Sequence, residues 1–148
     1  MKNSIKLSSI LLLLCSNIFA QIVKDSKGHF INSKGDIYLN GLKVGFITKD
    51  SLIKNAKGKK IAFLKANGTL EDVKGKNLGH WGKDGRMFYN DSDVVVLQIR
   101  DNTDSETCDI LDANGKKIGN VHDSYKGVAC ALHCFENRMD MKKHKKIH

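Results

Sequence analysis

The sequence predicts an all-β fold, a meander of about five short β-hairpin repeats closed into a ring or barrel. Three observations predict it. A short motif recurs at a nearly fixed spacing, each copy carries two turn signals, and the runs between turns have the length of strands. The 148 residues include no proline, so the turns must be built from Gly, Asn, Asp and Ser.

The recurring motif is a turn followed four or five positions later by a small residue. Its copies are "NGLKVGFITKD", "KGKKIAFLKANG", "KGKNLGHWGKDG", the degraded "SDVVVLQIRDN" and "NGKKIGNVHDS". The small-residue column is Gly45, Ala62, Gly79, Leu97 and Gly119, with spacings of 17, 17, 18 and 22. A compressed sixth copy without the small residue stands before them in "DSKGHFINSKGD". A fixed short period is typical of arrays whose single unit cannot bury its own apolar face.

Each copy is expected to form one hairpin. Asn-Gly and Asp-Gly supply the positive φ angles that tight hairpin turns need, and runs of about 4–7 residues lie between the turns. Five hairpins give about ten strands.

Two apolar columns flank the small residue. Val44, Ile61, Leu78, Val96 and Ile118 precede it, and Ile47, Leu64, Trp81, Ile99 and Val121 stand two positions after it. Residues three apart in a regular strand point to opposite faces, so a bulge at Gly45, Gly79 and Gly119 would bring both columns to one interior. The alternative is a thin sheet that is apolar on both sides. We favour the bulge, because a repeated small residue needs a repeated steric reason.

The array must also hide its strand edges, and closure into a ring does so. The "NGKKIG" unit, the spacing near 17 and five copies behind a signal peptide resemble the five-fold β-flower family of secreted bacterial proteins. The ending "VHDSYKGVACALHCF" is similar to the apolar close of that family, and the resemblance covers residues 22–135. It implies five hairpin petals around a pseudo-five-fold axis and no particular activity. The fourth copy departs from the pattern at Asp93 and Leu97, which puts the geometry of that petal in question.

Residues 1–20 have the order of a secretory signal peptide. Lys2 and Lys6 precede the apolar run "ILLLL", and "SNIFA" ends on the small residue Ala20, after which we expect cleavage. The alternative, a lipoprotein site at Cys15, is disfavoured by the bulky Leu14 before it. The expected protein is secreted or periplasmic, with a repeat domain at 21–135 and a basic, flexible tail at 136–148. Removing the leader lowers the net charge from +9 to +7.

Three cysteines remain, Cys108, Cys130 and Cys134. Alternation places Cys130 and Cys134 on one face of a buried strand, too far apart to bond each other, so a disulfide would join Cys108 to Cys130 or to Cys134. The alternative is a metal or redox site at Cys130, His133 and Cys134. Structural zinc needs four ligands and the chain offers no second pair at ligand spacing, so packing or a disulfide is preferred and no metal or cofactor is predicted.

The remaining candidates for chemistry are weaker. The stretch "DNTDSETCD" gathers Asp101, Asp104, Glu106 and Asp109, but it lacks the glycine and the spacing of a calcium loop and is interpreted as an acidic surface loop. There is no "GxSxG", no phosphate-binding loop and no nucleophile with a base at motif spacing, so no catalytic residue is predicted.

His80 and Trp81 are the one aromatic–histidine pair inside a repeat. Trp81 stands in an interior column and is expected to pack in the core. His80 faces the other way, at the position held by Phe46 and Phe63 in neighbouring copies. The three would form an exposed row able to stack on a glycan, so His80 and Trp81 are weak candidates for ligand contact.

The tail "ENRMDMKKHKKIH" is basic, and the turns are rich in lysine. Nucleic acid is not an expected partner of an exported protein, whereas anionic envelope surfaces or polysaccharides are plausible contacts of the tail. The sequence therefore predicts a non-catalytic binding or scaffold element of the bacterial cell envelope, with an envelope protein or a glycan as partner and no oligomeric state specified. The alternative is a recognition module for an anionic or carbohydrate ligand, and a metal or thiol redox protein is the least favoured.

Overall fold

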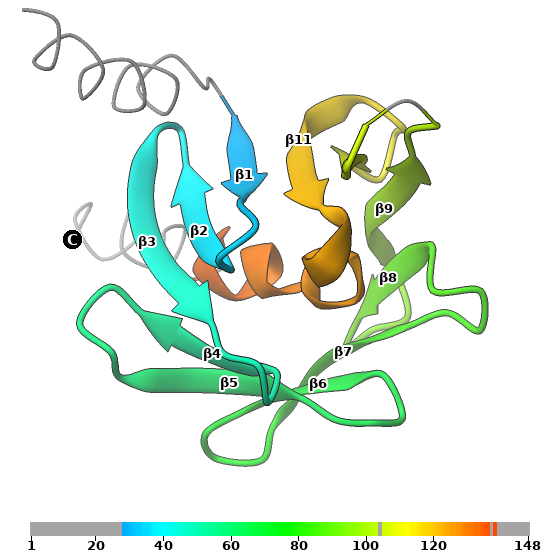
Figure 1. The fold of residues 1–148 in the computed structure, drawn as a ribbon. Coiled ribbons are helices and arrows are strands. Elements are labelled where there is room, and N and C mark those ends of the chain that lie inside the picture. The colour runs from blue at the N-terminus through cyan, green and yellow to red at the C-terminus, as the bar shows by residue number, and fades with distance from the viewer. Residues whose placement is uncertain (1–27, 104, 137, 139–148) are drawn as a thin grey trace, which may run out of the picture.

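The fold is a closed all-β barrel of eleven strands (Figure 1), seen in a computed structural model that describes residues 28–103, 105–136 and 138. The strands are β1 (His29–Ile31), β2 (Asp36–Leu39), β3 (Leu42–Ile47), β4 (Leu52–Asn55), β5 (Lys60–Leu64), β6 (Thr69–Asp72), β7 (Asn77–Trp81), β8 (Met87–Asn90), β9 (Val95–Asp101), β10 (Thr107–Leu111) and β11 (Lys117–His122). Within these residues no helix is long and apolar enough to cross a membrane. The predicted all-β class and ring closure are confirmed.

The barrel is closed by one parallel pairing. Neighbours from β1 through β11 pair antiparallel in chain order, and β1 then pairs parallel with β11, with His29 opposite Gly119 and Ile31 opposite Val121. The closing strand comes from the segment that the sequence presents as a compressed sixth copy. A Cβ atom at Gly119 would overlap the carbonyl oxygen of His29, so the closure depends on a residue without a side chain.

Five hairpins carry a register shift at the same place. In β2–β3, β4–β5, β6–β7, β8–β9 and β10–β11 the second strand has one extra residue, which stands just before the small-residue column. The predicted bulge is therefore present, and it occurs in the hairpins with Ala62 and Leu97 as well. All ten residues of the two flanking apolar columns belong to the core cluster or pack against it.

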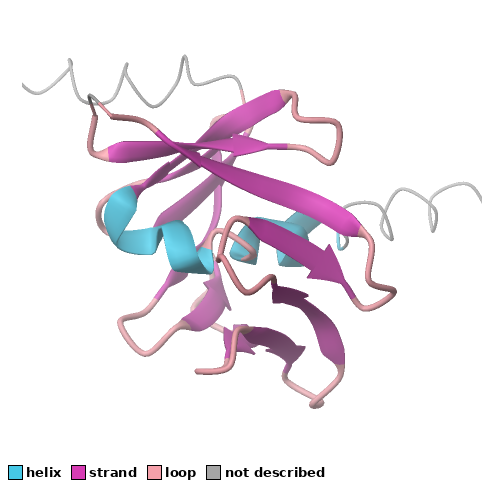
Figure 2. Cartoon of the chain, turned by 90° about the vertical axis from the view of Figure 1, so that its right-hand side faces the viewer, coloured by secondary structure: helices cyan, strands magenta, loops and turns pink. Residues whose placement is uncertain are grey.

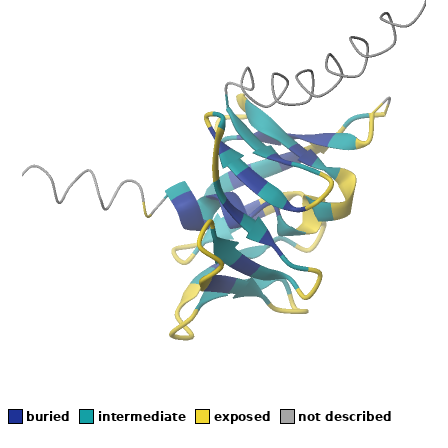
Figure 3. Cartoon of the chain, turned by 60° about the vertical axis from the view of Figure 1, so that its left-hand side comes forward, coloured by how far each residue is buried: buried dark blue, intermediate teal, exposed yellow. Residues whose placement is uncertain are grey.

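A third interior column lies opposite the small residues. Each of its members pairs with one small residue and is fully buried; they are Ile37, Ile53, Leu70, Phe88 and Ile110. At Gly79 a Cβ atom would overlap the carbonyl oxygen of Tyr89 and lie 2.7 Å from Cζ of Phe88. The steric reason for the small residue is thus the close approach of the paired strand and the large side chain that it carries. Buried residues accordingly occupy the middle of the strands and exposed residues the loops (Figure 3).

The turns of four of these hairpins share one hydrogen-bond pattern. The side-chain oxygen of an Asn or Asp accepts from the backbone N–H groups two and four residues later, at Asn55, Asp72, Asn90 and Asp112. In the fourth hairpin Asp93 takes a positive φ of 58°, close to the 80° of Gly58 and Gly75. The fourth copy therefore keeps the turn geometry that its sequence put in question.

The predicted strand through Cys130 and Cys134 is wrong. After β11 the chain forms the 3-10 helix η1 (Asp123–Val128), and residues 131–136 are helical. We call residues 129–136 the plug, because they lie inside the ring of strands (Figures 1 and 2). Ala129 to Leu132 are completely buried, and a Cβ atom at Gly45 would come within 3.1 Å of Cε1 of Phe135. The helix at 131–136 has six residues, most of them apolar and buried with His133 and Glu136 half-buried, and it is too short to show the amphipathic period by which a surface helix is predicted.

Several predictions fall outside the described residues. The signal peptide at 1–20, the lipoprotein site at Cys15 and nearly all of the basic tail at 136–148 are among them. At the start of the tail, the Glu136 carboxylate lies 2.7 Å from Nε2 of His29, which joins the end of the plug to β1.

Candidate functional site

The interior holds the residues proposed for metal or thiol chemistry. Cys130 and Cys134 are buried in the plug. His133, which stands between them in the sequence, has its ring centroid 5.7 Å from that of Phe88. Burial raises the pKa of both thiols, that of Cys134 to about 12, and lowers the pKa of His133. Within the described residues no group of three or more His, Cys, Asp or Glu side chains is arranged to hold a metal ion.

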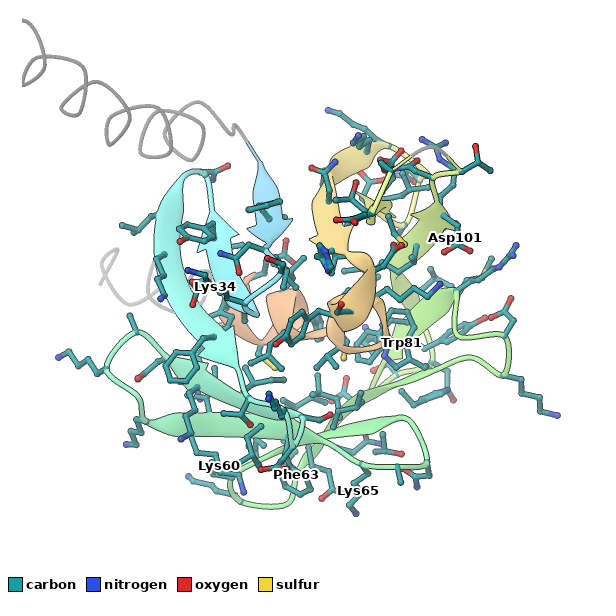
Figure 4. All side chains as sticks on the ribbon, in the orientation of Figure 1. Lys34, Lys60, Phe63, Lys65, Trp81 and Asp101 are labelled. Carbon is teal, nitrogen blue, oxygen red and sulfur yellow. The ribbon has the colours of Figure 1, made fainter. Side chains whose placement is uncertain are left out.

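Trp81 also belongs to the interior. Its Nε1 is buried and makes no hydrogen bond of standard geometry, and the indole lies beside Cys130, where it offsets part of the rise in the pKa of that thiol. Figure 4 shows the side chain among those inside the ring. Trp81 is partly buried and packs against the core cluster, as its place in the interior column predicts.

The predicted disulfide from Cys108 to Cys130 or Cys134 is not formed, since all three thiols are free. Cys108 lies on β10, outside the plug, and its Sγ is 3.0 Å from Oδ1 of Asp123 and 3.3 Å from Oδ1 of Asp101. Burial and these two carboxylates raise the pKa of the Cys108 thiol to about 12. Spacing along the sequence does not show that Cys130 and Cys134 lie in a helical plug rather than on a strand.

Free thiols with raised pKa values give a direct prediction. The chain lacking residues 1–20 should not react with iodoacetamide at pH 8 while folded, because the thiolate is the nucleophile and each thiol is buried. After unfolding in guanidinium without a reductant, all three cysteines should be modified, as read by mass spectrometry. Only one modified thiol would show that a disulfide forms after all.

The described carboxylates of the acidic stretch do not converge on one cation site. Asp101 pairs with Lys126 at 3.0 Å, and Glu106 lies 3.7 Å from Nε2 of His122. Asp109, in which only 5% of the surface is exposed, pairs with Arg100 and Lys117. Of this stretch, Asp104 is not described. Each of these three carboxylates lies beside at least one basic side chain. The interpretation as an acidic surface loop fits the exposed Asp101 and Glu106, but not Asp109, which is buried on β10.

Asp109 is the most tightly held carboxylate among them. Lys117 Nζ and Arg100 Nη2 each approach it to 2.7 Å and Asn102 Nδ2 to 3.0 Å; these contacts hold the pKa of Asp109 well below its usual range. A carboxyl whose pKa is lower in the folded than in the unfolded chain stabilises the fold above the unfolded value of about 3.9, and this contribution is lost as the pH falls below it.

We therefore expect Asp109→Asn to flatten the acid dependence of stability. The free energy of unfolding, measured by urea denaturation, should fall between pH 5 and pH 2 less steeply in the variant than in the parent chain. At pH 7 the substitution should cost about 2 kcal/mol, from hydrogen bonds to charged groups. Asp50→Asn, at an exposed turn, controls for the change in net charge. An unchanged slope would mean that Asp109 does not contribute through its charge.

The outer surface carries the row of aromatic rings that the repeat columns suggest. Phe46, Phe63 and His80 hold equivalent positions on β3, β5 and β7, one residue after the small residue, and all three are half-buried. Figure 4 shows Phe63 on the outer side of the ring. The other half-buried rings on these faces are Phe30, Tyr38 and Tyr89. We call these six residues the aromatic belt.

The rings of the aromatic belt contact one another across strands. The imidazole of His80 stacks on Tyr89, with centroids 5.4 Å apart and planes 13° apart. Phe30 and Tyr38 lie 6.2 Å apart. Tyr89 and Tyr38 lie on the first strand of their hairpins, so the column alignment did not reveal them. The strand register, which pairs Tyr89 with His80 and Tyr38 with Phe30, was the missing information.

Lysines accompany the two phenylalanines. Lys54 Nζ lies 5.9 Å from the ring centroid of Phe46, and Lys60 Nζ lies 4.6 Å from that of Phe63. The two acids beside these rings are neutralised, because Asp36 pairs with Lys43 at 2.7 Å and Glu71 pairs with Lys65. This part of the belt therefore has a cationic excess.

The rings of the belt lie on strands between β1 and β8, and the side of the barrel formed by β9, β10 and β11 carries none of them. At the equivalent positions of the last two hairpins stand the polar residues Gln98 and Asn120. That side is occupied by the charged cluster of Arg100, Asp109 and Lys117 described above. The asymmetry separates a candidate binding face from the rest of the outer surface.

Comparison of the chain with protein-family models, curated proteins and solved structures finds no match to any of them.

Proposed function

We propose that this chain is an exported, non-catalytic binding protein of the bacterial cell envelope, and that the aromatic belt is its recognition surface. The observation that carries the proposal is the pairing of the half-buried rings of Phe46 and Phe63 with lysines on the outer surface of a barrel whose interior is filled by its own plug. Ring faces offer apolar contact and lysines offer charge, a combination suited to an anionic or carbohydrate ligand.

The fold supports membership of the five-fold β-flower family as part of the same proposal. Five hairpins carry the same register shift, and four share the same turn hydrogen bonds. The family resemblance names no activity, so the function is argued from the surface.

The placement of the reactive side chains supports a role without catalysis. The cysteines are buried with raised pKa values, which makes them poor nucleophiles and poor redox centres. The described carboxylates of the acidic stretch are bound to basic partners. Unlike the buried cysteines and the paired carboxylates, the aromatic belt lies on the outer surface, where its rings and lysines can contact a ligand.

A glycan array probed with the fluorescent chain lacking residues 1–20, at 50 mM and 500 mM salt, tests the proposal together with cross-linking and mass spectrometry in the native cells. We expect binding to acidic glycans that weakens as salt rises, because exposed charges are screened. Cross-linked envelope proteins without glycan binding would favour the scaffold role. If the chain binds no glycan and forms no cross-links, the proposed function is refuted.

A further inference from the structure

We propose that the ligand of the aromatic belt is an extended acidic polysaccharide, which runs across the strands and places one disaccharide on each hairpin. This inference rests on the proposed function and adds the ligand class, the direction of binding and the length of the site. It concerns Phe46, Phe63 and His80, the three rings at equivalent positions of consecutive hairpins.

The spacing of the rings sets the repeat of the ligand. Phe46 on β3 and Phe63 on β5 are separated by one strand, as are Phe63 and His80 on β7. Neighbouring strands lie about 4.8 Å apart, so the three rings recur every roughly 10 Å across the sheet. That distance is about the length of one disaccharide in an extended polysaccharide. Three rings that each contact one disaccharide therefore fit a hexasaccharide.

The contacts beside the rings specify an acidic sugar. Within the described residues, neither Lys54 nor Lys60 lies within salt-bridge distance of a carboxylate, and each ammonium group sits over a ring instead. A uronic acid stacked on a ring through its C–H face would bring its carboxylate to the adjacent lysine. A neutral glycan would offer no carboxylate to either ammonium group.

The outer aliphatic residues do not favour a membrane surface as the ligand. The most exposed ones, Leu42, Val73 and Val94, lie at the turns of three different hairpins and apart from the ring positions. Adsorption to a bilayer through these aliphatic residues would not involve Phe63. Lipid binding can therefore be distinguished from glycan binding by its insensitivity to Phe63→Leu.

The test is a length series of oligouronates measured by calorimetry with the chain lacking residues 1–20. We expect the affinity to rise from disaccharide to hexasaccharide and to change little for the octasaccharide. Phe63→Leu, which keeps apolar volume and removes the ring, should weaken hexasaccharide binding at least about tenfold. Lys54→Gln with Lys60→Gln should weaken it similarly and remove most of its salt dependence.

A matched control lies at the same column of the fourth hairpin. Gln98→Ala should leave the affinity unchanged, and the circular dichroism melting curve of each variant shows whether it is folded. Cellohexaose, polyglutamate of matched charge and phosphatidylglycerol vesicles serve as the alternative probes. Weak binding of all three, beside strong binding of the hexauronate, is the expected result.

Three results would overturn the inference. Equal binding of polyglutamate that is insensitive to Phe63→Leu would show a purely electrostatic surface, with the proposed binding function retained. Binding of vesicles without binding of oligouronates would show a lipid ligand. Failure of every probe would overturn the ligand class, and the proposed function would fall with it only if cross-linking in cells also found no envelope partner.

Discussion

Gly119→Ala is expected to lower the free energy of unfolding by about 3 kcal/mol, because it forces apart the two strands that close the barrel. A Cβ atom there would overlap the carbonyl oxygen of His29 and lie 2.6 Å from its carbonyl carbon. Both are backbone atoms, so relief requires β1 to move away from β11. We expect earlier urea unfolding and faster hydrogen exchange of β1 amides.

Gly127→Ala is the matched control. Nothing lies within 4 Å of a Cβ atom at Gly127, which is exposed in η1, and its backbone is not in the left-handed region. This variant should stay within about 0.5 kcal/mol of the parent chain. Equal stability of the two variants would mean that β1 does not close the ring in solution.

Leu132→Ala should cost about 3 kcal/mol, because it removes a completely buried side chain from the plug and leaves a cavity among the strands. The plug supplies core residues that the short strands cannot supply by themselves. Chemical denaturation followed by tryptophan fluorescence is a suitable measurement, since Trp81 packs against the core cluster to which the plug belongs.

A Leu-to-Ala substitution at an exposed site controls for the change of side chain itself. Leu42 is 69% exposed at the first hairpin, so Leu42→Ala should change stability by less than about 0.5 kcal/mol. If Leu132→Ala were as mild as Leu42→Ala, residues 129–136 would not be part of the folded core.

The barrel was predictable from the repeat because each hairpin follows from local chemistry. Asn-Gly and Lys-Gly fix the turns, and the three-residue separation of Ile61 and Leu64 is compatible with one interior only if a bulge lies between them. The fourth hairpin kept its turn despite losing the glycine, because Asp93 tolerates a positive φ.

The plug and the closing strand were not predictable in the same way. Val128, Cys130, Leu132 and Cys134 alternate like a strand, and the helix at 131–136 is too short for its own period to be recognised beside that alternation. The strand β1 has only three residues, and its pairing with β11 is set by the closure of the ring rather than by its own sequence.

The candidate site was predicted in part. The repeat columns placed Phe46, Phe63 and His80 on the outer face and Trp81 on the inner face, and both placements agree with the structure. Tyr89 and Lys54 reach the rings of His80 and Phe46 through pairing between neighbouring strands, which the repeat columns do not show, whereas Lys60 lies on the same strand as Phe63. The disulfide prediction assumed a strand through Cys130 and Cys134, and spacing along the chain does not show that these residues lie in the plug.

The central claim is that this protein acts through the outer aromatic belt. It is tested most directly by a photo-crosslinking amino acid in the full chain, expressed in the native cells and placed at position 63 or at position 98. Both positions stand one residue after the small-residue column, position 63 inside the belt and position 98 on β9, where it pairs with no belt residue. We predict cross-links to an envelope component, seen as a shift in gel mobility, from position 63 and not from position 98. Cross-links of equal strength from both positions, or from position 98 alone, would contradict the claim.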